Sequence, residues 1–182
     1  MGKQVYLLLE VVQNGGSNVA VGISALRVNE GGQQNVAVGD TAMQNNTSGN
    51  TNVAVGQSAL GANTTASNNT AVGAYSLDAN TTGTSNTAMG TNSLTANTTA
   101  SNNTGLGMTT LAANTSGGEN VAIGAYALDA NTTGANNIAI GVNTLGANTT
   151  ASNNTGIGHN ALLANTTGTQ NTAVGVTALD AN

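Results

Sequence analysis

Few side chains in this sequence could do acid, base or metal chemistry, and they are widely spaced. His159 is the single histidine, and Asp78, Asp129 and Asp180 follow one another at intervals of 51 residues. In the repeat described below, three repeat units would separate neighbouring aspartates, which is about 14 Å at the spacing of stacked strands. That distance is too long for paired catalytic carboxylates or for carboxylates that share a calcium ion. The sequence therefore predicts a protein without enzymatic activity, cofactor or metal.

Asparagine and threonine offer a second kind of chemistry because they recur together every 17 residues. Stacked in register, the asparagines would hydrogen-bond to one another along a rod, which we take as their main role. Three other interpretations stay open. Asn-x-Thr and Asn-x-Ser sequences accept N-linked glycans in a suitable host, flat threonine rows would bind ice, and the polar rows would contact carbohydrate. The predicted asparagine ladder consists of Asn63, Asn80, Asn97, Asn114, Asn131, Asn148 and Asn165.

A five-residue unit sets the position of every other residue. It consists of Asn, then Val, Ile or Thr, then Ala or Gly, then a larger aliphatic residue, then Gly. The unit recurs every 17 residues without insertion or deletion, which indicates equivalent coils that stack on one another. We call them coils 1 to 10 and number positions 1 to 17 from the first asparagine of each. The coils begin at Asn18, Asn35, Asn52, Asn69, Asn86, Asn103, Asn120, Asn137, Asn154 and Asn171.

A second period of 51 residues is superimposed on the first. Residues 69–119 resemble residues 120–170, so that Ala74-Tyr75 returns as Ala125-Tyr126. Because 51 residues are three repeats, this similarity indicates duplication in units of three coils.

The composition excludes a thick core and several classes of partner. Phe, Trp, Pro and Cys are absent, and charged residues make up 5% of the chain, where about 25% is usual. Lys3 and Arg27 are the only basic residues, and the net charge is −5, so nucleic acid is not an expected partner. The absence of cysteine removes disulfides and thiolate zinc sites. Apolar residues at fixed positions argue against disorder.

Each coil is predicted to contain two short strands, at about positions 2–4 and 8–11. Glycine at position 5 and the Asn-Thr-Thr-Gly stretch would form the corners, and equivalent strands would pair in parallel about 4.8 Å apart. Position 3 is always Ala or Gly, which predicts close approach of another backbone, either the opposite wall of the same roll or a neighbouring chain. We favour side-by-side chains in a trimer. The predicted thin core includes Val21, Leu26, Val55, Leu60, Val72, Leu77, Ile123, Leu128, Ile140, Leu145, Ile157 and Leu162.

Residues 1–17 break the pattern and precede the repeat domain of residues 18–182. Their apolar run predicts a strand that is either a degenerate first coil or a strand used for assembly. It is far shorter than the ~20 residues that span a bilayer, so membrane insertion is not expected. The pattern stays regular to the last residue, so we expect the last coil to pair with further polypeptide or with this segment of another copy. The possible assembly strand comprises Val5, Tyr6, Leu7, Leu8 and Leu9.

The repeats resemble the head repeats of trimeric autotransporter adhesins and related repeats of bacteriophage tail fibres. The similarity lies in Asn-Thr-Ala-Val-Gly followed by Ala-Leu and Asn-Thr-Thr-Gly, and it covers nearly all of residues 18–182. It implies a left-handed parallel β-roll, three chains about one axis, and a location outside the cell, on a cell surface or on a virion.

The sequence thus predicts a non-enzymatic structural fibre segment with a surface adhesion role, as an adhesin head or a phage fibre shaft. One alternative is a subunit that assembles end to end into an extracellular filament, and another is an ice-binding protein. The expected partners are further copies of the chain and a carbohydrate or protein on a host surface.

Overall fold

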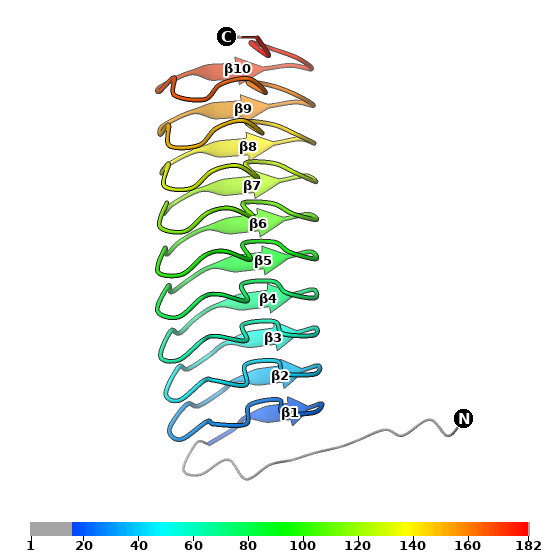
Figure 1. Ribbon diagram of the computed structural model, residues 1–182, viewed down its shortest axis with the longest axis vertical. Coiled ribbons are helices and arrows are strands. Elements are labelled where there is room, and N and C mark those ends of the chain that lie inside the picture. Colours follow the sequence, from blue (N-terminus) through cyan, green and yellow to red (C-terminus); the bar gives the residue numbers. More distant parts are fainter. Residues whose placement is uncertain (1–15, 182) are drawn as a thin grey trace, which may run out of the picture.

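The computed structural model describes residues 16–181, which form a single stack of coils (Figure 1). Each coil contributes one three-residue strand, and the ten strands pair in parallel and in chain order in one sheet. The predicted all-β parallel solenoid with a 17-residue repeat is therefore confirmed. The possible assembly strand, residues 5–9, lies outside the described residues. The strands are β1 (Val19–Val21), β2 (Val36–Val38), β3 (Val53–Val55), β4 (Thr70–Val72), β5 (Thr87–Met89), β6 (Thr104–Leu106), β7 (Val121–Ile123), β8 (Ile138–Ile140), β9 (Thr155–Ile157) and β10 (Thr172–Val174).

The register joins equal positions of neighbouring coils. Ala37 in β2 pairs with Ala54 in β3, and Ala54 pairs with Ala71 in β4. Stacked at about 4.8 Å per coil, ten strands give a sheet roughly 50 Å long. Every residue of one coil therefore has its equivalent in the next coil as its immediate neighbour along the rod.

The second strand predicted at positions 8–11 is wrong, because turns occupy these positions throughout residues 16–181. Non-glycine residues at positions 7 and 9 adopt a left-handed backbone, with φ of 53° at Ser58 and 52° at Leu60. Two left-handed residues within three positions prevent an extended chain. The turns are still tied along the rod, since the Leu60 N–H donates to the Ser76 carbonyl of the next coil at 3.0 Å. We call positions 7–11 of each coil the turn wall.

Leucine at position 9 fills the interior. A left-handed backbone costs a non-glycine residue about 1–2 kcal/mol, whereas full burial of a leucine side chain contributes about 1.5–3 kcal/mol. Burial therefore offsets the backbone conformation at this position. The leucines predicted to lie in the core are at most 2% exposed, and they are Leu26, Leu60, Leu77, Leu128, Leu145 and Leu162.

The aliphatic residues at position 4 lie on the outside of the sheet. In β3, Ala54 is fully buried while Val53 and Val55 on either side of it are partly exposed. Side chains alternate between the two faces of a strand, so positions 2 and 4 share the outer face when position 3 points inward. The prediction that position 4 belongs to the core of the single chain is therefore wrong. It concerned Val21, Val55, Val72, Ile123, Ile140 and Ile157, of which Val21, Val72, Ile140 and Ile157 are 36% or 37% exposed.

The small residue at position 3 packs against the opposite wall of its own stack. This is the other of the two predicted alternatives, and not the neighbouring chain that we favoured. A Cβ atom on Gly105 would lie 2.5 Å from Ser93 Oγ and 2.8 Å from Thr110 Oγ1, both at position 8. A Cβ atom on Gly156 would lie 2.7 Å from Thr144 Cγ2. Both glycines thus lie against a serine or threonine side chain at position 8. The turn wall therefore lies across the interior from the strand.

Gly105→Ala is expected to destabilise the rod by about 1–3 kcal/mol, because the added methyl group overpacks this contact. Adding Ser93→Ala and Thr110→Ala should remove most of that penalty, because these changes delete the two side-chain oxygens that the new methyl group would meet. Urea denaturation of the parent, the glycine variant, the position-8 variant and their combination measures the coupling. If Gly105→Ala lowered the free energy of unfolding equally in the parent and in the Ser93→Ala, Thr110→Ala variant, the proposed contact would be wrong.

Candidate functional site

The asparagines at position 12 form a continuous hydrogen-bonded ladder inside the coils. Asn63 Nδ2 donates to Asn46 Oδ1 of the preceding coil at 2.8 Å and to the Ala66 carbonyl at 3.1 Å. The same two bonds recur along the rod, so each amide uses both of its hydrogens in the interior. The ladder holds one corner of each coil. Its predicted members Asn63, Asn80, Asn97, Asn114, Asn131, Asn148 and Asn165 are at most 2% exposed.

Burial excludes these asparagines as acceptors of N-linked glycans in the folded rod. Asn131 is fully buried, and its Nδ2, the atom that a glycan would join, already donates to Asn114 Oδ1 and to the Gly134 carbonyl. The middle residue of this Asn-x-Thr sequence also stabilises the stack, because Thr132 Oγ1 donates to the Thr149 carbonyl at 3.0 Å. The repeated Asn-x-Thr sequence is therefore a structural element of the coil.

A second asparagine ladder, at position 1, was not singled out from the sequence. The Asn52 N–H donates to Asn35 Oδ1 at 2.9 Å, and Asn52 Nδ2 donates to the Ala66 carbonyl at 2.8 Å. The carbonyl at position 15 thus accepts hydrogen bonds from two asparagine side chains of its own coil, Asn52 and Asn63. Asparagine occupies position 1 in all ten coils, and this regularity could have predicted a second ladder.

Threonines at positions 13 and 14 have different roles. Thr81 Oγ1 donates to the Thr98 carbonyl of the next coil at 3.1 Å, and the equivalent bond recurs at Thr115. Position 14 is exposed, as at Thr82 and Thr133. Both positions lie at bends. The exposed hydroxyls at position 14 therefore form a single row along the rod. A single row gives a flat ice surface less contact than threonines on a sheet face would.

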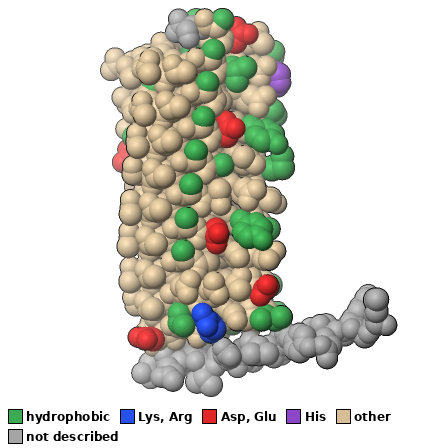
Figure 2. Space-filling view, in the orientation of Figure 1, with side chains coloured by type: hydrophobic (Ala, Val, Ile, Leu, Met, Phe, Trp, Pro, Cys, Tyr) green, Lys and Arg blue, Asp and Glu red, His purple; other side chains and the backbone are tan. Residues whose placement is uncertain are grey.

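Asp78, Asp129 and Asp180 occupy position 10 of coils 4, 7 and 10 on the turn wall, and they stay apart. Position 10 of the two coils between the first pair carries Thr95 and Ala112. Figure 2 shows the acidic side chains as separate groups on a mostly uncharged surface. Within residues 16–181, no three His, Asp or Glu side chains lie close enough to hold a metal ion.

Burial raises the pKa of the Asp78 carboxyl above its ordinary value. It also raises the pKa of Asp129, although hydrogen bonds from the backbone N–H groups of Asp129 and Ala130 partly oppose the effect. These carboxyls are thus partly desolvated. His159, at position 6 of coil 9, is exposed.

The largest candidate functional surface is the outer strand face, which we define as the side chains at positions 2 and 4 of β1 to β10. Each of these residues is Val, Ile, Leu, Met or Thr, so the face carries no charge. Leu106 is 46% exposed, and Met89 and Ile138 are each 39% exposed. An apolar surface that runs the length of a molecule is unusual for a soluble monomer and marks an interaction site.

The chain matches no protein-family model, no curated protein and no solved structure. The described part of the chain contains no helix with the length and apolar character needed to cross a membrane.

Proposed function

We propose that this protein is a non-enzymatic structural segment of an extracellular fibre, in which copies pack side by side through the outer strand face. The observation that supports this is the face itself. It is continuous over ten paired strands, apolar or threonine at every position, and partly or fully exposed in the single chain. A second copy offers a surface of the same length, the same repeat and the same chemistry.

The distribution of charge favours this contact. Each copy carries a net charge of −5, so like charges oppose association in general. The acidic residues, however, lie away from positions 2 and 4: Glu30 is at position 13, Asp40 at position 6, Asp78 at position 10 and Glu119 at position 17. Contact between outer strand faces therefore brings aliphatic side chains together without placing carboxylates in the centre of the contact.

A trimer is the assembly that we propose, following the resemblance of the repeats to adhesin heads. Three copies that turn their outer strand faces toward a common axis would cover all three faces in a closed arrangement. The turn walls would remain on the outside. A rod of this kind, on a cell surface or a virion, presents its turn walls to a host carbohydrate or protein, which is the adhesive role we propose.

Ile140→Asp is expected to convert the assembly into single folded chains. Ile140 is 36% exposed in the single chain, so a carboxylate there stays solvated in the monomer but would be desolvated at the centre of the contact. Thr150→Asp, at exposed position 14 of the same coil, is the matched control and should leave the mass unchanged. Sedimentation and native mass spectrometry report the mass, and circular dichroism reports the fold.

A parent chain that stays monomeric at high concentration would contradict this proposal, as would identical masses for the two variants. Filaments many rods long in electron micrographs would favour end-to-end assembly instead.

A further inference from the structure

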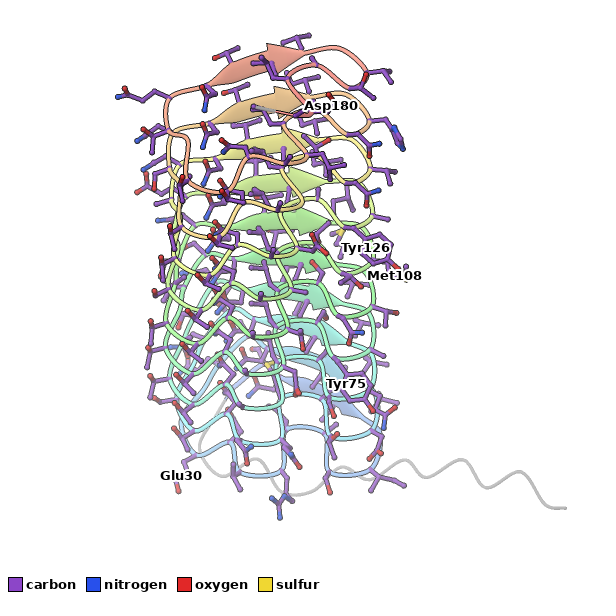
Figure 3. The ribbon with its side chains drawn as sticks, turned by 45° about the horizontal axis from the view of Figure 1, so that its top comes forward. Glu30, Tyr75, Met108, Tyr126 and Asp180 are labelled. Carbon is purple, nitrogen blue, oxygen red and sulfur yellow. The ribbon has the colours of Figure 1, made fainter. Side chains whose placement is uncertain are left out.

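Two of the three aromatic residues in the chain stand at the same position, three coils apart. Tyr75 and Tyr126 occupy position 7 of coils 4 and 7, and they are 39% and 40% exposed. Figure 3 shows both on the same side of the rod, with Met108 beside Tyr126. In a chain without Phe or Trp, this repeated exposure of the largest side chains is a distinct surface feature.

Position 7 has a left-handed backbone in every coil, and both tyrosines adopt it with φ of 58° and 59°, although bulky residues seldom do. Coils 5, 8 and 9 have asparagine at this position, which tolerates the left-handed region far better. At position 9, burial of leucine offsets the same conformation, but Tyr75 and Tyr126 remain exposed. Packing within the coil therefore does not explain why tyrosine, and not asparagine, occupies this position in coils 4 and 7.

A carboxylate accompanies each tyrosine on the turn wall. Asp78 and Asp129 follow three residues later, at the other end of a four-residue turn. In the equivalent turn of coil 3, the Gly61 N–H donates to the Ser58 carbonyl at 3.1 Å, and the ends of such turns lie within about 7 Å. The two residues between them are buried, whereas each tyrosine is exposed and each aspartate is partly exposed.

An amide lies beside each tyrosine in the next coil. The N–H of Asn92 donates to the Ala74 carbonyl, and the N–H of Asn143 donates to the Ala125 carbonyl, both at 3.1 Å. These bonds place the asparagine directly after the tyrosine along the rod. An aromatic ring, a carboxylate and an amide thus form one set, which occurs as Tyr75, Asp78 and Asn92 and again as Tyr126, Asp129 and Asn143.

We propose that each set binds one unit of a neutral carbohydrate. The C–H face of a sugar ring packs on the tyrosine, the carboxylate accepts hydrogen bonds from sugar hydroxyls, and the amide both donates and accepts. An acidic sugar is disfavoured, because the aspartate and the net charge of the chain repel it. The two sets lie three coils apart, about 14 Å, so a repeating glycan that reaches both gains avidity.

This inference rests on the adhesive part of the proposed function and not on the assembly. The turn wall lies across the coil interior from the outer strand face, as the contact of Gly105 with Ser93 and Thr110 shows. A side-by-side assembly through the strands therefore leaves the turn wall open.

The test uses the assembled full chain on an array of neutral, sialylated and sulfated oligosaccharides. The neutral oligosaccharide with the strongest signal is then titrated while the tyrosine ring protons are followed by NMR. With no Phe or Trp in the chain, the aromatic NMR signals of tyrosine come from three residues.

Tyr75→Asn and Tyr126→Asn should each weaken binding about tenfold or more, and the double variant should abolish it. Asparagine is already resident at position 7 of other coils, so these variants keep the fold, and Met108→Ala is the control for an exposed side chain nearby.

Four results would overturn the inference: no binding of any neutral oligosaccharide at millimolar concentration, unchanged affinity in the tyrosine variants, preference for sulfated or sialylated glycans, or tyrosine rings that are protected from solvent in the assembly. A basic peptide that binds these sets in place of a glycan would also overturn it. If Ile140→Asp still dissociates the assembly in those cases, only the ligand inference fails. If glycans bind but no assembly forms, only the proposed fibre fails.

Discussion

Leu128→Asp should unfold the middle of the rod. Leu128 is fully buried, and its N–H donates to the Thr144 carbonyl of the next coil at 3.1 Å. The change removes about 1.5–3 kcal/mol of side-chain burial and adds the cost of a buried, unpaired carboxylate, which is several kcal/mol. The sum is comparable with the ~5–15 kcal/mol that stabilises a typical domain. Because each coil contacts only its neighbours, failure in coil 7 separates the coils on either side of it.

Circular dichroism during thermal unfolding measures this effect as a loss of β signal and a lower melting temperature. Thr133→Asp, at an exposed position of the same coil, is the control and should change stability by no more than about 0.5 kcal/mol. Leu128→Met should be tolerated within about 1.5 kcal/mol, since Met43 occupies the same position in coil 2 and is fully buried. An unchanged melting temperature for Leu128→Asp would contradict the position of this leucine in the interior.

Asn131→Asp should destabilise the rod strongly at neutral pH and less in acid. Asn131 Nδ2 donates to Asn114 Oδ1 at 2.9 Å and to the Gly134 carbonyl at 3.0 Å, and its Oδ1 accepts from Asn148 Nδ2 at 3.0 Å. A carboxylate keeps the shape of the amide but has no hydrogen to donate, so its charge would face two carbonyl oxygens. The lost bonds and the buried charge together cost several kcal/mol.

The pH dependence of this variant has a definite sign. Burial beside two carbonyl oxygens would raise the folded-state pKa of the introduced carboxyl above its unfolded value of about 3.9. The folded state then binds the proton more tightly than the unfolded state, so stability rises as the pH falls through the folded pKa. The protonated group also regains one O–H donor for the ladder.

Urea denaturation at pH 7 and near pH 4, each relative to the parent protein, measures this difference. Asn136→Asp is the matched control, because Asn136 is exposed and aspartate tolerates its φ of 59°. A penalty for Asn131→Asp that does not change with pH would show that the carboxylate reaches solvent, and the ladder would then not be closed to water.

Several features of this protein were determined by the sequence alone. Ten copies of equal length fix the register, because parallel coils that hydrogen-bond to one another must present equal positions, as Ala37 does to Ala54. Leu128 and Asn131 could be placed in stacked rows for the same reason. Each coil has one leucine or methionine at position 9 and one asparagine at position 12, and a residue type that returns at a fixed position must stack on itself.

Only the tertiary structure decided which face of the strand lies inside. Val53, Ala54 and Val55 are all apolar, and alternation shows which of them share a face but not which face is buried. The narrow interior of the coil determines which face is buried, because position 8 lies directly across from position 3. The space between them admits a methyl group at most, and beside Thr110 it admits only the hydrogen of Gly105. The same tight interior requires left-handed residues at positions 7 and 9, where Ser58 and Leu60 give no local signal for that backbone.

The surface sets on the turn wall also depended on the tertiary structure. The return of Ala74-Tyr75 as Ala125-Tyr126 was visible in the sequence, but the turn that brings an aspartate close to each tyrosine was not. Asp78 lies close to Tyr75 because a turn joins them, and Asn92 lies close because one full coil brings it back to the same corner. The proximity of Asn92 follows from the 17-residue register, whereas that of Asp78 could be known only from the turn, because the sequence predicted a strand at positions 8–11.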